Sequence, residues 1–216
     1  MTPPLRGLIF DLDGTLCDTL PVCIAAFQDV FARYALRPYS ADEIRALFGP
    51  DEAGIIQRVI GDDWEAGLAH YLDAYASAHD ACPAPFKGLL PLLHDLQARD
   101  VPLALVTGKG AGSCAISLER LGLATFFSVV KTGSAAGAVK PQRIRAVLAH
   151  WGIPPEQVAY VGDAPTDVLD ARACGVVALA AAWATSSDPT ALAATQPAAL
   201  FPTVADFARW VDRYVI

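Results

Sequence analysis

The sequence has few positive charges. Its 216 residues include 16 Lys and Arg against 23 Asp and Glu, which gives a net charge of −7. Only four of the basic residues are lysines, namely Lys87, Lys109, Lys131 and Lys140. We expect no nucleic-acid partner, because binding to a phosphate backbone depends on clustered Lys and Arg. The scarcity of lysine makes each one worth examining as a ligand for a single anionic group.

The sequence also lacks long apolar runs and the usual spacing of metal-binding cysteines and histidines. Its longest apolar stretch, residues 175–184, is much shorter than the roughly 20 residues that span a membrane. No segment resembles a secretory signal, so we expect a cytoplasmic protein with no membrane partner. The five cysteines form no CxxC pair and the four histidines form no HxxxH or HExxH motif. Neither a disulfide framework nor a zinc site is predicted.

Short apolar runs, however, alternate with helical segments. Hydrophobic residues make up 54% of the chain, enough to bury a full core. Strand-like runs occur at residues 5–13, 101–108, 126–130, 157–163 and 175–180. Helical patterns occur at residues 89–99, 112–123, 141–152 and 165–175. Continuous apolar runs are typical of parallel strands covered on both faces, so we predict an α/β fold with a Rossmann-like, doubly wound parallel sheet.

Residues 17–85 break this alternation. They have helical spacing of apolar residues and no strand-like run, which predicts an α-helical domain inserted after the first strand. The α/β core domain would then comprise residues 1–16 and 86–216, with the proline-rich stretch 82–88 as the linker back to it. We expect residues 184–200 to mix loop with a short helix.

Acidic residues stand where the first and fourth strands end. Asp11 and Asp13 follow the first strand two positions apart, so that in an extended chain both side chains project to the same side. Asp163 closes the fourth strand. Ligands of an open parallel sheet bind beyond the carboxyl ends of its strands, so these carboxylates should meet there. They would repel one another unless a cation such as Mg²⁺ neutralised them.

Two other strand ends supply groups that bind phosphate. Thr107 ends the second strand, and Lys140 follows the third at some distance. A hydroxyl donor and a fixed positive charge suit a bound phosphoryl group. With a carboxylate nucleophile and a metal, they indicate phosphoryl transfer through an aspartyl-phosphate. An Asp-Gly hairpin turn would be the structural alternative for Asp11 and Asp13, but a helical segment rather than a second strand follows them.

Four short motifs, in this order, resemble those of the haloacid dehalogenase-like hydrolase superfamily. They are DLDGT at 11–15, VTGK at 106–109, Lys140 within VKPQ, and VGDAPTD at 161–167. The resemblance extends over nearly the whole chain and is closest to the phosphoglycolate phosphatase-like branch. It implies a Rossmann-like core and identifies the helical insert as similar to the small helical cap domain of that superfamily.

The resemblance implies a role for each acidic motif residue. Asp11 would be the nucleophile. Asp13 would be the general acid that protonates the leaving oxygen and then the base that activates water. Mg²⁺ would be bound by the side chains of Asp11 and Asp163 and by the backbone carbonyl of Asp13. Asp167 would assist this metal site or orient Lys140.

The resemblance likewise implies how the phosphoryl group is held. Thr107 and Lys140 would contact its oxygens, and the backbone N–H groups of Leu12 and Gly108 would be additional donors. This chain has Gly108 where close phosphoglycolate phosphatases often have Asn, and Ala164 where Ser or Thr is more frequent. These departures remove no catalytic group, but they bear on the substrate.

Candidates for binding the rest of the substrate lie beside the second motif and in the insert. Lys109 can approach an anionic substrate, although a surface lysine at a helix start is an equal alternative. Arg45, Glu52 and Arg58 flank or belong to the predicted loop at 47–54, which would face the site. An ordinary solvated helix face is an equal alternative for these three residues.

The expected function is a Mg²⁺-dependent phosphatase that hydrolyses a small phosphomonoester such as 2-phosphoglycolate, as a monomer or homodimer. Asp13 separates the chain from the similar dehalogenases, which do not have this second aspartate. The absence of lysine from residues 17–85 separates it from phosphonoacetaldehyde hydrolases. A sugar phosphomutase or an inorganic pyrophosphatase of the same superfamily, and a non-catalytic metabolite-binding protein, stay open as alternatives.

Overall fold

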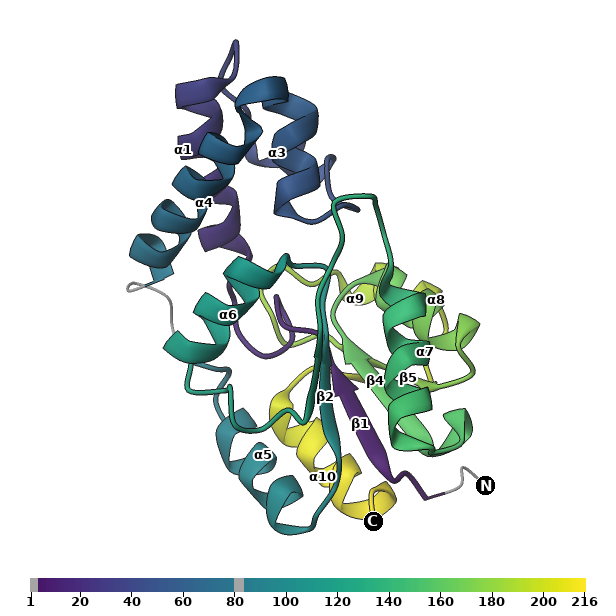
Figure 1. Ribbon diagram of the computed structural model, residues 1–216. Coiled ribbons are helices and arrows are strands. Elements are labelled where there is room, and N and C mark those ends of the chain that lie inside the picture. Colours follow the sequence, from purple (N-terminus) through teal and green to yellow (C-terminus); the bar gives the residue numbers. More distant parts are fainter. Residues whose placement is uncertain (1–3, 80–83) are drawn as a thin grey trace.

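The computed structural model describes residues 4–79 and 84–216 as a layered core with a group of helices above it (Figure 1). The core contains a six-stranded parallel sheet with the order β3-β2-β1-β4-β5-β6. Its strands are β1 (Gly7–Phe10), β2 (Leu103–Val106), β3 (Val129–Lys131), β4 (Val158–Gly162), β5 (Val177–Ala181) and β6 (Ala199–Phe201). The predicted doubly wound parallel sheet is confirmed. Strand β6 was not predicted, because we expected only loop and a short helix at 184–200.

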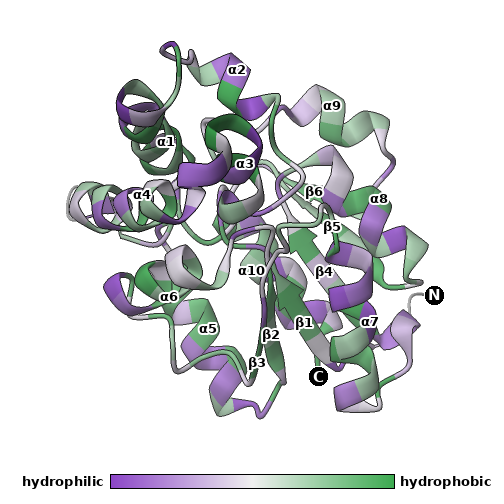
Figure 2. Ribbon diagram, turned by 45° about the horizontal axis from the view of Figure 1, so that its top comes forward, coloured by the Kyte–Doolittle hydropathy of each residue, from purple (hydrophilic) through white to green (hydrophobic). Residues whose placement is uncertain are grey.

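Helices cover both faces of this sheet. On one face lie α5 (Leu89–Ala98), α6 (Ala111–Arg120) and α10 (Val204–Tyr214). On the other lie α7 (Lys140–Trp151), α8 (Pro165–Ala173) and α9 (Pro189–Ala194), with the short helix η2 (Pro155–Gln157) before β4. Within β1, Leu8 and Phe10 pack against the first set and Ile9 against the second, since strand side chains alternate between faces. Strands β1 and β2 at the centre of the sheet are accordingly hydrophobic (Figure 2).

The inserted helices have a hydrophobic core of their own. They are α1 (Leu20–Tyr34), α2 (Ala41–Arg45), α3 (Glu52–Ile60), η1 (Gly61–Asp63) and α4 (Trp64–His79). Buried rings of α1 and α4 lie together at its centre: Phe27 lies 4.6 Å from Tyr71, and Tyr71 stacks on Tyr75 at 5.8 Å between ring centroids. This separate core provides a rigid group of helices that faces the edge of the sheet.

The carboxyl ends of the central strands point toward the inserted helices (Figure 1). Phe10 at the end of β1 is in register with Leu105 of β2 on one side and with Val161 of β4 on the other. The residues that follow these three strands therefore gather at one edge, between the sheet and the insert.

Two further observations concern the lengths of the helices and the cysteines. None of the described helices is long and apolar enough to cross a membrane. Four cysteines are buried in the structure: Cys17, Cys23, Cys114 and Cys174. Cys82 lies outside the described residues, as does the start of the predicted linker at 82–88.

Candidate active site

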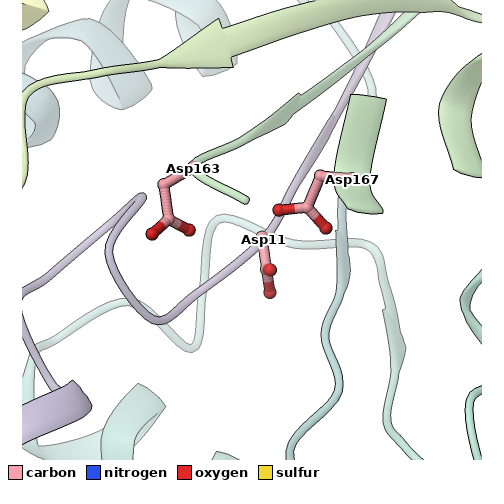
Figure 3. A group of neighbouring side chains, drawn as sticks. All are labelled: Asp11, Asp163 and Asp167. Atoms are coloured by element: carbon pink, nitrogen blue, oxygen red, sulfur yellow. The ribbon is translucent and has the colours of Figure 1, made fainter. Parts of the chain in front are cut away.

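Three carboxylates meet where β1 and β4 end (Figure 3). Asp11 follows β1, Asp163 follows β4, and Asp167 lies in the first turn of α8; one oxygen of each lies within 4.8 Å of the others. Burial raises the pKa of Asp11 to about 6, although the Lys140 charge opposes this rise. Burial, together with the charges of Asp167 and Asp11, also raises the pKa of Asp163 well above its ordinary value. The three carboxylates thus carry more negative charge than the nearby Lys140 ammonium neutralises.

A hard divalent cation such as Mg²⁺ fits this cluster, because carboxylate oxygens are its preferred protein ligands. A cation there would relieve the repulsion that contributes to the raised pKa of Asp163. Gly14 makes room for the Asp163 carboxylate, since a Cβ at position 14 would lie 2.1 Å from Asp163 Oδ2. The hydroxyl of Thr15 donates to Asp163 Oδ1 at 3.3 Å and fixes the orientation of this side chain.

Asp167 is engaged through both of its oxygens. Its Oδ1 accepts hydrogen bonds from the Lys140 ammonium and, at 3.4 Å, from the Tyr160 hydroxyl. Its Oδ2 accepts from the Ala164 N–H at 3.1 Å. Lys140 also donates to Asp11 Oδ2 at 2.7 Å. Of the two roles that the sequence left open for Asp167, these contacts favour the one in which it orients Lys140.

Lys140 is a permanent positive charge beside the nucleophile candidate. Burial by itself would lower its pKa, but the charges of Asp11 and Asp167 more than offset burial and raise the pKa well above its usual range. Lys140 opens α7, and Pro141 follows in the first turn, where its missing N–H costs no helical hydrogen bond. The position of Lys140 is therefore determined by the start of a helix as well as by two carboxylates.

Neutral donors lie in the loops that follow β1 and β2. Thr107 directly follows β2, is 2% exposed, and is held by a hydrogen bond from its N–H to the Lys131 carbonyl at 3.0 Å. Gly108 is exposed, and a Cβ there would meet open space. The Leu12 N–H donates to Asp11 Oδ1 at 2.7 Å. Thr107, Gly108 and Leu12 therefore all belong to the loops around Asp11.

Asp13 lies where the chain passes from the core into the insert. Its side chain is 25% exposed, and its Oδ1 accepts a hydrogen bond from the hydroxyl of Thr19, the residue before α1. The Lys109 ammonium lies 3.2 Å from the same oxygen. The acid-base candidate is thus held by one residue of the insert boundary and one residue of the core.

Glu52 and Lys109 lie at the contact between insert and core. Glu52 opens α3, and its carboxylate accepts hydrogen bonds from the Gly110 N–H and the Ser113 hydroxyl at the start of α6. The Lys109 ammonium lies 3.8 Å from Glu52 Oε1 and 4.4 Å from the centre of the Tyr75 ring of α4. The structure therefore brings both residues to the site, where Lys109 contacts both Glu52 and Asp13.

The structure places the two predicted arginines of the insert elsewhere. The Arg45 guanidinium pairs with Asp42 of its own helix at 2.8 Å, and its side chain is 48% exposed. Arg58 is exposed on α3, six residues beyond Glu52. Within the described residues, no hydrogen bond or ion pair joins either arginine to the groups around Asp11.

Several residues of the site were not singled out from the sequence. Thr15 orients Asp163, and Thr19 orients Asp13. Both threonines lie within eight residues of Asp11, so the hydroxyl residues that follow the DLDG stretch could have been identified from the sequence. The Trp183 indole donates to the Thr15 carbonyl at 3.0 Å and so links β5 to the nucleophile loop. Nothing local in the sequence indicated Trp183, since its partner lies 168 residues away.

Comparison with known proteins identifies the family of this chain. The family model of haloacid dehalogenase-like hydrolases matches residues 8–181. The chain is 31% identical to a phosphoglycolate phosphatase of Rhodospirillum rubrum, covering 95% of this chain and 90% of the relative. It is 28% identical to the pyrophosphatase PpaX of Oceanobacillus iheyensis, covering 83% of this chain and 84% of the relative.

Among solved structures, CbbY from Rhodobacter sphaeroides in complex with phosphate is similar, with a TM-score of 0.79. The two chains are 18% identical, and the match covers 94% of this chain and 96% of that one, so this likeness concerns the fold. The four ordered motifs, the matched family model and the curated relatives agree. The chain belongs to the haloacid dehalogenase-like hydrolase family and is an enzyme of its phosphatase type.

Proposed function

We propose that the protein is a Mg²⁺-dependent phosphatase that hydrolyses small phosphomonoesters through a phosphorylated Asp11. The observation that carries this proposal is the position of the Asp11 carboxylate. It lies 2.7 Å from the Lys140 ammonium, within 4.8 Å of Asp163, and beside the Thr107 loop. A nucleophile, a fixed positive charge and a cation-binding carboxylate around one point are the requirements of phosphoryl transfer.

The first half of the reaction uses both aspartates of the DLDGT motif. A carboxylate oxygen of Asp11 forms a bond to phosphorus while the bond between phosphorus and the ester oxygen breaks. Asp13 gives its proton to the leaving oxygen, which departs as an alcohol. Lys140 and the hydroxyl of Thr107 hold the phosphoryl oxygens during the transfer.

The second half returns the enzyme to its starting state. Asp13, now a carboxylate, takes a proton from water as the water oxygen attacks phosphorus. The bond from phosphorus to Asp11 breaks, inorganic phosphate leaves, and both aspartates regain their original protonation. Mg²⁺, held by Asp11, Asp163 and the backbone carbonyl of Asp13, would neutralise the negative charge that separates a carboxylate from a phosphoryl group.

Access to this site requires the insert to move. Asp11 is 7% exposed and Lys109 is 4% exposed, and the insert contributes Glu52 and Tyr75 to their surroundings. We infer that α1 to α4 act as a cap, with residues 17–85 as the cap domain. Closure would exclude water during transfer to Asp11, and opening would admit substrate and release products.

The substrate class that best fits this account is a small phosphorylated metabolite. The curated relatives include phosphoglycolate phosphatases, which makes 2-phosphoglycolate one candidate, and a pyrophosphatase, which makes pyrophosphate another. A sugar phosphomutase would use the same Asp11 and Asp13 but would depend on a sugar bisphosphate for activation. A cytoplasmic protein acting as a monomer or homodimer is consistent with this function.

A phosphate-release assay tests the proposal. Wild-type protein is assayed on a panel of phosphate esters and pyrophosphate with Mg²⁺ and with EDTA, beside Asp11→Asn. Asp73→Asn removes the same charge from an exposed position of α4 and serves as the control. We expect turnover that requires both Mg²⁺ and Asp11 and that survives in the control. Turnover by Asp11→Asn at the wild-type rate, or binding of phosphate without any turnover, would contradict the proposal.

A further inference from the structure

The start of α6 is an anion-binding position that the protein itself fills. Helix N-termini present free N–H groups and positive partial charge, and this one begins at Ala111, three residues after Gly108 and beside the proposed phosphoryl site. Its Gly110 N–H and its Ser113 hydroxyl both donate to Glu52, whose side chain is 6% exposed. A carboxylate of the substrate would therefore have to displace Glu52 to bind there.

The positive charge of Lys109 is likewise compensated by groups of the protein itself. Its ammonium contacts Asp13 at 3.2 Å and Glu52 at 3.8 Å and lies over the Tyr75 ring, and its side chain is 2% exposed. Two carboxylates thus compensate one ammonium, and an aromatic ring covers it. With the insert in this position, Lys109 is compensated by two carboxylates and has almost no exposed surface for a charged group of the substrate.

Within the described residues, the arginines of the insert make no hydrogen bond or ion pair with the groups around Asp11. The Arg37 guanidinium pairs with Glu43 at 2.7 Å, and the Arg45 guanidinium pairs with Asp42 at 2.8 Å. Arg33 lies over Tyr34 and beside His70 on the outer side of α1 and α4. Arg58 is exposed on α3, and no hydrogen bond or ion pair within the described residues joins it to the groups around Asp11. The charged insert residue that contacts Lys109 is therefore the acidic Glu52.

We propose that the site selects a phosphomonoester whose leaving alcohol carries no carboxylate, and that Glu52 determines this selectivity. The inference rests on the proposed phosphatase function and narrows its substrate class to esters of uncharged alcohols such as polyols or sugars. A carboxylate placed next to Asp13 and Glu52 would lose its hydration without gaining a partner, while a hydroxyl can donate to either side chain. By this account 2-phosphoglycolate is a poor substrate.

Matched pairs of esters test the selectivity. In 2-hydroxyethyl phosphate a CH₂OH group replaces the carboxylate of 2-phosphoglycolate, and glycerol 3-phosphate stands in the same relation to 3-phosphoglycerate. We expect kcat/KM of the wild-type enzyme to be at least about tenfold higher for the uncharged member of each pair. Equal values, or a preference for the carboxylate, would overturn the inference while leaving the phosphatase function intact. No turnover of any ester would overturn the function itself.

A charge-removing variant tests the role of Glu52. Glu52→Gln keeps an oxygen acceptor for the Gly110 N–H but leaves Lys109 with one carboxylate in place of two. We expect the ratio of kcat/KM between uncharged and carboxylate esters to fall at least about threefold, mainly through a lower KM for the carboxylate esters. Glu65→Gln removes the same charge from an exposed position of α4 and should leave the ratio unchanged. Equal losses for both members of each pair in Glu52→Gln would mean a purely structural role and would contradict the proposal.

Discussion

At the scale of single residues, Gly14 links the backbone to the metal site. Its φ is +71°, and a Cβ there would lie 2.1 Å from Asp163 Oδ2. An alanine would therefore both strain the backbone and displace one of the proposed Mg²⁺ ligands. Gly122 has a nearly equal φ of +67°, but a Cβ there would meet open space. The two positions separate the effect of backbone strain from the effect on the site.

We accordingly predict that Gly122→Ala loses about 1–3 kcal/mol of stability, because it forces a side chain into the left-handed region, and that Gly14→Ala loses at least as much, because its Cβ also meets the Asp163 carboxylate. Only Gly14→Ala should lose activity, by about a hundredfold or more, together with the stabilisation that Mg²⁺ gives to the wild-type protein. Thermal unfolding with and without Mg²⁺, and phosphate release under saturating substrate, measure these effects. Full activity of a folded Gly14→Ala protein would refute the position assigned to Asp163.

At the scale of elements, the start of α3 lies close to the backbone of the core. The Asp51 N–H donates to the Ser134 carbonyl at 3.0 Å, and a Cβ on Gly54 would lie 2.4 Å from the Ala135 carbonyl oxygen. This closeness places Glu52, between these two residues, against the start of α6. The glycine in the first turn of α3 is therefore required by the contact between two domains rather than by the helix.

Gly54→Ala should consequently lower kcat/KM at least about tenfold, because the helix cannot approach the core backbone. Its melting temperature should stay the same or rise, since alanine favours a helix over glycine by up to about 1 kcal/mol. Gly112→Ala is the matched control: its Cβ would meet only the tip of the Leu72 side chain, at 2.9 Å, which can rotate away. If both variants kept wild-type kcat/KM, closure of α3 on the core would not be part of catalysis.

At the scale of the whole molecule, much of the site could be predicted from the order of the elements. In a parallel sheet the carboxyl ends of all strands share one edge. Because the sequence places Asp11, Thr107 and Asp163 at the ends of strands, these residues could be expected to lie close together. Strand β6 was missed because its three residues, Ala199 to Phe201, form no recognisable run after an alanine-rich segment. Pairing with β5 makes these residues a strand.

The contacts of Glu52 and Lys109 could not be predicted in the same way. Both were candidates for binding substrate, yet each has protein partners in the structure: Glu52 bonds to Ser113, 61 residues away, and Lys109 to Asp13, 96 residues away. Such contacts depend on where the insert lies relative to the core, and no periodicity in the sequence records that placement. The sequence indicates the reaction through its motifs, while the selectivity depends on this packing.

The most direct test of the central claim is to trap phosphate on Asp11. Asp13→Asn cannot activate water, but with p-nitrophenyl phosphate the leaving group needs no acid, so the phosphorylated enzyme should accumulate. Borohydride reduction would then convert Asp11 to homoserine, which peptide mass spectrometry locates. We predict homoserine at position 11 only when both substrate and Mg²⁺ are present. A burst of p-nitrophenol with an unmodified Asp11 would contradict the account.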